Sequence, residues 1–190
     1  RFRFPGRMLI DTIVDIPIVL PPLVLGLSLL ILFHLSIGGW ELETWLRDKV
    51  GFPVTYRWPA VVLAQFSLAC AFAVRTMRVT FYQIDPRAED VARTLGCTRG
   101  QAFMQIALPQ AWRGMIAATT IAWARALGEF GPILVFAGAT RMRTEVLSTT
   151  VFLELSIGNL DAAVAVSLLM VVMAVVVLFV LRLLGTGLTS

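Results

Sequence analysis

Two charged residues stand in an otherwise apolar stretch and are the first candidates for chemistry. Arg125 and Glu129 lie four residues apart, a spacing that places both side chains on one helix face, where they can pair. A lone charge at membrane depth costs roughly 3 kcal/mol or more, whereas a pair that faces protein or water costs much less. Two interpretations stay open: a structural ion pair that locks helices together, or an arginine that supplies positive potential along the path of an anion.

The residues around this pair predict an interrupted helix. Gly128, Gly131 and Pro132 all disfavour continuous helix. Non-helical backbone at membrane depth either lines a cavity or is tightly packed in protein, so a gate is a third interpretation. The candidate pore or gate therefore consists of Arg125, Gly128, Glu129, Gly131 and Pro132.

Catalytic and metal-binding patterns are missing from the sequence. It has one histidine, His34, and two cysteines, Cys70 and Cys97, too few for a multi-histidine metal centre or a disulfide framework. No Ser/His/Asp set, phosphate-binding loop or metal-ligand spacing occurs. We therefore expect no cofactor, no metal and no enzymatic activity in this chain.

The composition indicates a membrane protein. Of 190 residues, 58% are apolar and 15% charged, and mean hydropathy is +0.83; soluble domains carry about 25% charged residues. We predict an all-α, polytopic membrane helix bundle that forms a single domain over residues 1–190. Because the sequence begins with Arg1 and not with Met, its N-terminal part is expected to be missing.

Four spans are predicted, at about 14–37, 58–81, 112–138 and 161–183. A membrane helix needs about 20 largely apolar residues, and no Asp, Glu, Lys or Arg occurs in Ile16–Trp40, in Trp58–Val74 or in Ala162–Leu181. The third span is included although Arg125 and Glu129 interrupt it. Prolines at 17, 21 and 22 predict a kink in the first span, either structural or pore-lining.

The positive charges orient these spans. If residues 1–12 are cytoplasmic, ten of the 16 Lys and Arg residues lie on the cytoplasmic side, five on the outer side, and Arg125 within the membrane. This bias follows the positive-inside rule. The net charge of +4 therefore needs no nucleic-acid partner, and a long loop between the second and third spans becomes cytoplasmic.

Small residues recur every four positions in the third span, at Gly114, Ala118, Ala122 and Ala126. Small residues at this spacing let helices approach closely. We expect them to pack against another span or a second subunit, with a narrow pore wall as the alternative.

The cytoplasmic loop, residues 85–109, predicts two short helices joined by a glycine elbow. Asp85 and Pro86 suit a helix start, Gly96 a left-handed helix end, and Thr98 with Gln101 a capping box. Leu108-Pro109 is expected to end the second helix. The pair exposes apolar side chains for a partner groove, or folds back on its own bundle; the side chains are Val91, Leu95, Phe103 and Ile106.

This loop resembles the signature of ATP-binding-cassette importer permeases. That signature is Glu-Ala-Ala, three residues, Gly, nine residues, Ile, one residue, Leu-Pro. Here Asp90-Val91-Ala92 is followed at the same spacing by Gly96, Ile106 and Leu108-Pro109, with Asp and Val as conservative departures. The resemblance implies a coupling loop that docks on an ATP-hydrolysing subunit through Asp90, Val91, Ala92, Leu95, Gly96, Phe103, Ile106, Leu108 and Pro109.

Other segments are similar to the molybdate, tungstate and sulfate branch of that family. They are Trp123–Pro132, Val135–Gly138 and Leu155–Ala162, while Phe4–Gly6 and Ile18–Leu23 are more similar to molybdate permeases. Pro132 departs from the small residue usual there. The resemblance implies an importer permease in the cell (inner) membrane, most similar to those for molybdate or tungstate. Because members of the family usually have one or two spans before this region, it also implies that N-terminal spans are missing. Its partners would be a second permease copy, ATPase subunits and an extracytoplasmic solute-binding protein.

Two alternatives remain open. One is a permease of the same family for sulfate or another substrate. The other is a structural or assembly membrane protein whose inner loop binds a different partner.

Overall fold

The computed structural model describes residues 6–36 and 38–186, and all regular structure in these residues is helical. This confirms the predicted all-α class. The α-helices are α1 (Arg7–Val19), α2 (Pro22–His34), α3 (Leu42–Trp45), α4 (Trp58–Gln83), α5 (Pro86–Thr94), α6 (Arg99–Ala102), α7 (Leu108–Gln110), α8 (Trp112–Leu127), α9 (Leu147–Ser156) and α10 (Leu160–Thr186). Three π-helical turns accompany them, η1 (Leu46–Val50), η2 (Phe103–Ala107) and η3 (Ile133–Ala137).

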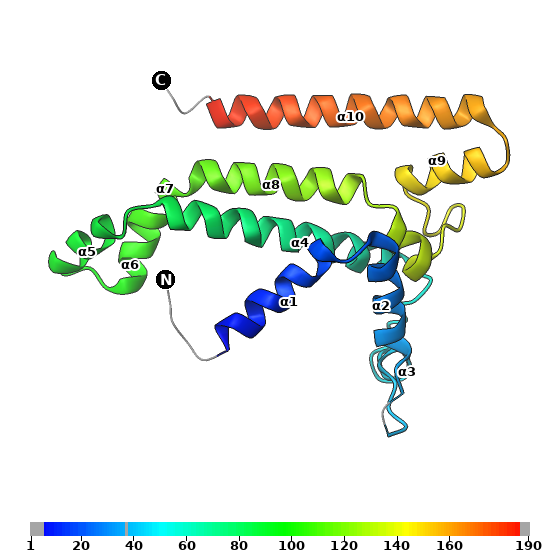
Figure 1. Cartoon of the computed structure of the whole chain (residues 1–190), viewed down its shortest axis with the longest axis horizontal. Helices are drawn as coiled ribbons and strands as arrows, with labels where there is room; N and C mark the ends of the chain where they lie inside the picture. The colour runs from blue at the N-terminus through cyan, green and yellow to red at the C-terminus, as the bar shows by residue number, and fades with distance from the viewer. Residues whose placement is uncertain (1–5, 37, 187–190) are drawn as a thin grey trace.

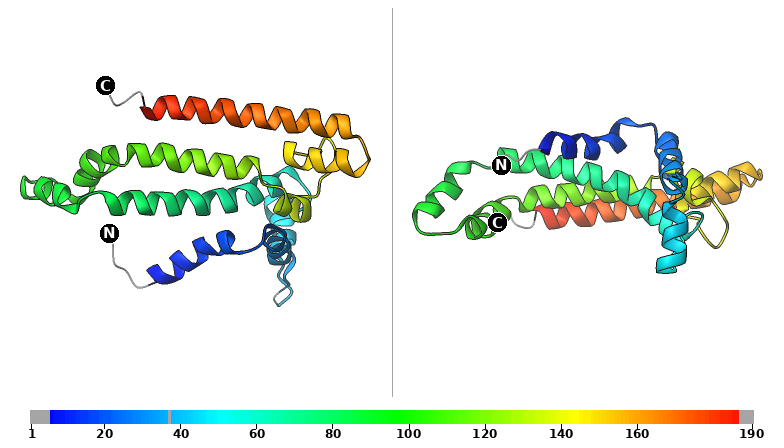
Figure 2. Two further views of the ribbon diagram at one scale, coloured as in Figure 1. Left: turned by 45° about the horizontal axis from the view of Figure 1, so that its top comes forward. Right: turned by 90° about the horizontal axis from the view of Figure 1, so that it is seen from below.

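An antiparallel pair of helices, α4 and α8, forms the centre of the molecule (Figure 1). The segment α5–α7 connects their ends and projects beyond the ends of α1 and α10 (Figure 2). Helix α1 packs along α4, and α2 runs steeply across the far end of the pair. The connecting segment and the α2 region thus lie at opposite ends of α4 and α8.

Two of the described helices are long and apolar enough to cross a membrane. They are Trp58–Gln83 and Leu160–Leu183, with mean hydropathies of 1.6 and 3.2, and they match the spans predicted at 58–81 and 161–183. In the 18-residue apolar stretch of α10 that could cross a membrane, 0% of the residues are buried inside the protein. A helix that is apolar all round and unburied in the protein suits a lipid environment. The count of four spans remains a prediction.

The span predicted at 14–37 is not one kinked helix. Helix α1 ends at Val19, Leu20 and Pro21 have extended backbones with ψ of 138° and 140°, and α2 begins at Pro22. Consecutive prolines remove two N–H donors and disfavour helical geometry in the residue before each of them. Pro17, by contrast, is accommodated inside α1.

The span predicted at 112–138 is also divided. Helix α8 ends at Leu127 after 16 residues, and η3 starts only at Ile133. The chain becomes helical again at Gly131 and Pro132. Below, the helix break denotes residues 128–132, which lie between α8 and η3. Gly128, Gly131 and Pro132 predict this interruption, although residues 112–138 were expected to form a single span.

The apolar core lies where α2, the start of α4 and η3 meet. Ile133, Phe136 and Ala137 are fully buried there, and the rings of Phe33 and Phe136 are 5.2 Å apart between centroids. The Glu43 carboxylate accepts backbone N–H bonds from the loop before α4, at 3.0 Å for the Val54 N–H. This core fixes α2 against the segment that follows the helix break.

The small-residue stripe of α8 makes two different contacts. Gly114 lies directly against Thr80 of α4, and Ala118 is buried, which confirms the predicted packing against another helix. Ala118, Ala122 and Ala126 also line an open groove between α4 and α8, about 580 Å³ in volume.

Replacing Gly114 by alanine is expected to destabilise the bundle by about 1–3 kcal/mol, the usual cost of overpacking. A Cβ at this position would lie 2.1 Å from Thr80 Cγ2, and the Thr80 hydroxyl is held by the Thr76 carbonyl at 3.0 Å. Thermal unfolding of the purified chain in detergent measures the loss. The double variant Gly114→Ala/Thr80→Gly should recover part of it, and Ala117→Val, on the exposed side of α8, should change little. Equal stability of Gly114→Ala and wild type would contradict the close packing.

Candidate functional site

The connecting segment has the predicted local structure. We call residues 85–110 the elbow. The Asp85 carboxylate accepts the Arg87 N–H at 2.9 Å and Pro86 occupies the first turn of α5, while Thr98 and Gln101 form the capping box of α6. Gly96 has φ of +96°, a left-handed conformation that glycine adopts without strain. Two helices therefore meet at a defined angle.

Several apolar side chains of the elbow are exposed, as predicted. Val91 is 59% exposed and Leu95 81%. Met104, which the sequence analysis did not single out, is 62% exposed; its place next to Phe103 in a sparsely charged helix was the available signal. Exposed apolar groups clustered on a projecting element favour a protein partner. In the described residues, no other element covers Leu95 or Val91.

The other predicted coupling residues of the elbow differ in how far they are exposed. Phe103 packs on Phe81 of α4, with ring centroids 5.7 Å apart. Ala92 is buried, and Ile106 is half-buried rather than exposed as predicted. Asp90 is exposed and forms a long ion pair with Arg93, 3.5 Å from Oδ1 to Nη1.

Leu108-Pro109 does not end the second helix, contrary to the prediction. Pro109 lies in α7, directly after the π-turn η2. The backbone stays in the right-handed helical region through Phe103, Leu108 and Ala111 into α8. The π-turn η2 accommodates the proline, so the elbow passes into α8 without an extended residue.

The predicted ion pair between Arg125 and Glu129 is not formed. Helix α8 ends between them, so they do not share a helix face. Arg125 is exposed and its guanidinium carbon lies 4.5 Å from the centre of the Phe72 ring in α4, a cation–π contact. Glu129 is only 5% exposed, and its backbone carbonyl accepts a 2.7 Å hydrogen bond from Ser148.

The helix break is packed against α2 through glycines. A Cβ on Gly26 would lie 2.7 Å from Pro132 Cα, and one on Gly131 would lie 3.0 Å from Pro22 Cβ. Gly131 and Pro132 are buried, whereas Gly128 is exposed. The sequence analysis did not identify Gly26, because a single glycine in an apolar helix carries no signal for its distant neighbour.

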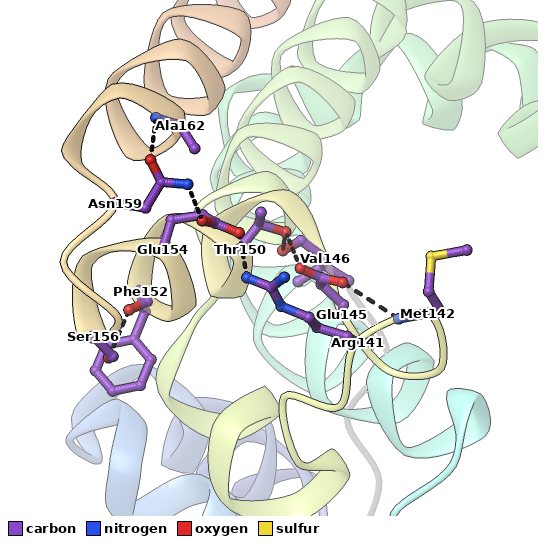
Figure 3. A network of polar contacts seen from close by, with 10 residues as sticks. All are labelled: Arg141, Met142, Glu145, Val146, Thr150, Phe152, Glu154, Ser156, Asn159 and Ala162. Carbon is purple, nitrogen blue, oxygen red and sulfur yellow. Dashed lines mark hydrogen bonds and ion pairs between the residues drawn. The ribbon is translucent and has the colours of Figure 1, made fainter.

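A polar network braces the loop that follows the helix break (Figure 3). Arg141 pairs with the Glu154 carboxylate, which also accepts a 2.9 Å hydrogen bond from Asn159. Glu145 accepts the Met142 N–H at 3.3 Å. These bonds tie the loop to α9 at the end of the molecule opposite the elbow. In the residues that the structure describes, no group of three or more His, Cys, Asp or Glu side chains could hold a metal ion.

Comparison with known proteins shows the family to which this chain is similar. Residues 1–189 match the family described as binding-protein-dependent transport system inner membrane component. The sulfate transport system permease protein CysT of Escherichia coli K12 is 36% identical over 179 residues, 94% of this chain and 63% of that protein. The chain thus spans less than two thirds of that relative.

Relatives from molybdenum systems are similar as well. The putative molybdenum transport system permease protein YvgM of Bacillus subtilis is 32% identical and covers 96% of this chain, which spans 79% of it. ModB, the molybdenum transport system permease protein of Escherichia coli K12, is 38% identical over 72% of this chain and 58% of its own length.

The fold is also found in a solved structure. A bacterial ABC transporter involved in the import of the acidic polysaccharide alginate matches all of this chain and 69% of its own, with a TM-score of 0.73 and 20% sequence identity. The match over residues 1–189 and the similarity to these relatives show the family of this chain. It belongs to the binding-protein-dependent transport system inner membrane components.

Proposed function

We propose that this chain is the membrane-spanning subunit of an ATP-driven importer of an oxyanion. Family membership and the sulfate and molybdenum relatives support this class. The observation that carries the mechanism is the projecting elbow, whose exposed Val91 and Leu95 suit a groove on a separate protein. Its proposed partners are two ATPase subunits, a second permease copy and an extracytoplasmic binding protein.

The elbow is connected to the proposed gate along the chain. Helical backbone runs from Arg99 through η2 and α7 to Leu127, where the helix break begins. At the other end of the elbow, α5 joins α4 through only Ile84 and Asp85. Because α4 and α8 pack closely, a shift of the elbow acts on both helices at once. ATP binding by the partners would favour one of two bundle states through different contacts with the elbow.

The proposed topology has four spans, at about 14–37, 58–81, 112–138 and 161–183, within one domain, with the elbow in the cytoplasm. In this arrangement the helix break lies toward the outer side of the membrane, beside the braced loop. Gly128, Glu129, Gly131 and Pro132 are proposed as the gate, and Arg125 as a source of positive potential for an anion.

Molybdate or tungstate is the proposed substrate, and sulfate is the second candidate. Local similarity to molybdate permeases and 38% identity to ModB favour the first. The 36% identity to CysT over 94% of the chain favours sulfate equally well. The helix break residues carry nothing that distinguishes these anions by size, and the binding protein is proposed to set most of the selectivity.

Reconstitution tests the proposal. The chain is assembled in vesicles with its ATPase subunits and binding protein, and ATP hydrolysis is measured with each oxyanion. Stimulation and uptake with molybdate or tungstate, but not with sulfate, are expected. Stimulation by sulfate alone selects the second candidate. A chain that assembles with no ATPase subunit would instead be a structural membrane protein.

A further inference from the structure

A cavity of about 950 Å³ lies behind the elbow, on the side that faces α4. The end of α4 and the inner faces of α5 and α6 line it. Val74, Met77 and Phe81 of α4 provide an apolar wall, and Phe103 continues this wall from the elbow. Val91 and Leu95, the exposed apolar groups proposed to contact the ATPase subunit, are not among the lining residues, whereas Asp90 and Phe103 of the same loop are.

Three arginines and two carboxylates also line the cavity. Arg78 pairs with Asp11 of α1 at 3.1 Å, and Arg93 pairs loosely with the lining residue Asp90 at 3.5 Å. The second lining carboxylate belongs to Glu89. Arg99 is exposed and has no ion pair with any residue that the structure describes. The cavity thus combines an apolar wall with an arginine available for an anionic group.

The position of the cavity matches the edge of a membrane. Helix α4 has 26 residues, about 39 Å at 1.5 Å per residue, whereas the hydrocarbon core is about 30 Å thick. With Trp58, 63% exposed, at the outer interface, the last turns of α4 extend into the inner headgroup region. Val74 and Met77 then lie at acyl-chain depth, and Arg78 and the elbow arginines at headgroup depth.

We propose that this cavity binds an anionic phospholipid of the cytoplasmic leaflet. Arg99 and Arg93 contact the phosphate, and the first part of an acyl chain lies along Val74, Met77 and Phe81. Basic pockets beside membrane helices on the cytoplasmic side suit anionic headgroups. A free oxyanion needs no apolar wall, so the lining favours the lipid over a soluble anion. The bound lipid would hold the elbow against α4 and so influence how elbow movement reaches the bundle.

Native mass spectrometry of the purified chain, titrated with phosphatidylglycerol, tests this site. Arg93→Gln and Arg99→Gln should each weaken binding about fivefold, and the double variant about thirtyfold, at about 1 kcal/mol per arginine near an anionic lipid. Arg87→Gln is the matched control, because Arg87 lies on the same helix as Arg93 but outside the cavity. Val74→Trp, which fills the apolar wall without changing charge, should also weaken binding.

The outcomes separate the possible occupants. Equal binding of phosphatidylcholine, displacement of the lipid by millimolar inorganic phosphate, or equal loss in Arg87→Gln would each overturn the proposal. The site rests on the cytoplasmic placement of the elbow proposed above, which is tested separately. In a Cys70→Ser background, a membrane-impermeant maleimide should label Cys97 only from the cytoplasmic side. Labelling of Cys97 from the outside would reject the proposed orientation. If the orientation and substrate uptake are as proposed but the wild-type chain does not bind phosphatidylglycerol, only the lipid site is rejected.

Discussion

Substitution of Gly96 by valine is expected to reduce substrate uptake by about tenfold or more, while the proposed ATPase subunits continue to hydrolyse ATP. Gly96 has φ of +96° and joins α5 to α6. A side chain in left-handed backbone costs about 1–2 kcal/mol, more when it is β-branched, and 1.4 kcal/mol is a tenfold change in a population. Helices α5 and α6 would therefore no longer meet at the angle that Gly96 allows. Movement of the proposed ATPase subunits would then not be transmitted to α8.

A second glycine in the elbow provides the control. Gly100 lies in α6 with helical backbone, and a Cβ at either Gly96 or Gly100 meets nothing within 4 Å. Gly100→Val therefore adds the same atoms without the left-handed strain and should keep most of the uptake. Uptake and ATP hydrolysis are measured together in reconstituted vesicles. Normal coupled uptake by Gly96→Val would refute the role of the elbow as a coupling element.

Gly26→Ala is expected to impair both stability and uptake, because it separates α2 from the helix break. The new Cβ would lie 2.7 Å from Pro132 Cα and 3.0 Å from the Pro132 carbonyl oxygen. These are backbone atoms, so no side-chain rotation relieves the clash. Overpacking of this kind costs about 1–3 kcal/mol, and the displaced segment is the proposed gate. Thermal unfolding in detergent and uptake in vesicles measure the two effects.

The opposite result is expected for a glycine with open surroundings. Gly100→Ala should be neutral or stabilise the chain by up to about 1 kcal/mol, since alanine favours helix over glycine. If the Gly26→Ala chain unfolds at a lower temperature but transports normally, the contact of α2 with the helix break has no role in gating. One that matches wild type in both assays would contradict the close approach of α2 and the helix break.

The elbow shows how much a sequence determines when the relevant interactions are local. Asp85, Pro86, Gly96 and the Thr98–Gln101 capping box were each identified from residue type and spacing, and each has the expected role. These interactions join residues at most four positions apart, so no distant contact can easily override them. The two long apolar helices at 58–83 and 160–186 followed equally directly from composition.

Other features depended on residues that are far apart in the chain. The sequence placed Arg125 beside Glu129, but the end of α8 separates them and Arg125 lies over Phe72 instead. The cavity behind the elbow, which Asp90 of the predicted coupling loop also lines, takes its apolar wall from α4 and so depends on contacts between distant residues. A hydropathy profile averages over neighbouring residues and carries no information on which side chains contact one another in the fold.

By itself, then, the sequence determined the helical class, the glycine elbow and the family of this protein, because periodicity, capping and motif spacing act within short segments. The tertiary structure decided where the apolar stretches break, which glycines touch and what lies behind the elbow. The breaks at Leu20–Pro21 and at residues 128–132 are held by contacts such as Gly26 with Pro132 and Gly131 with Pro22. Those contacts exist only after α2 and the end of α8 have packed together.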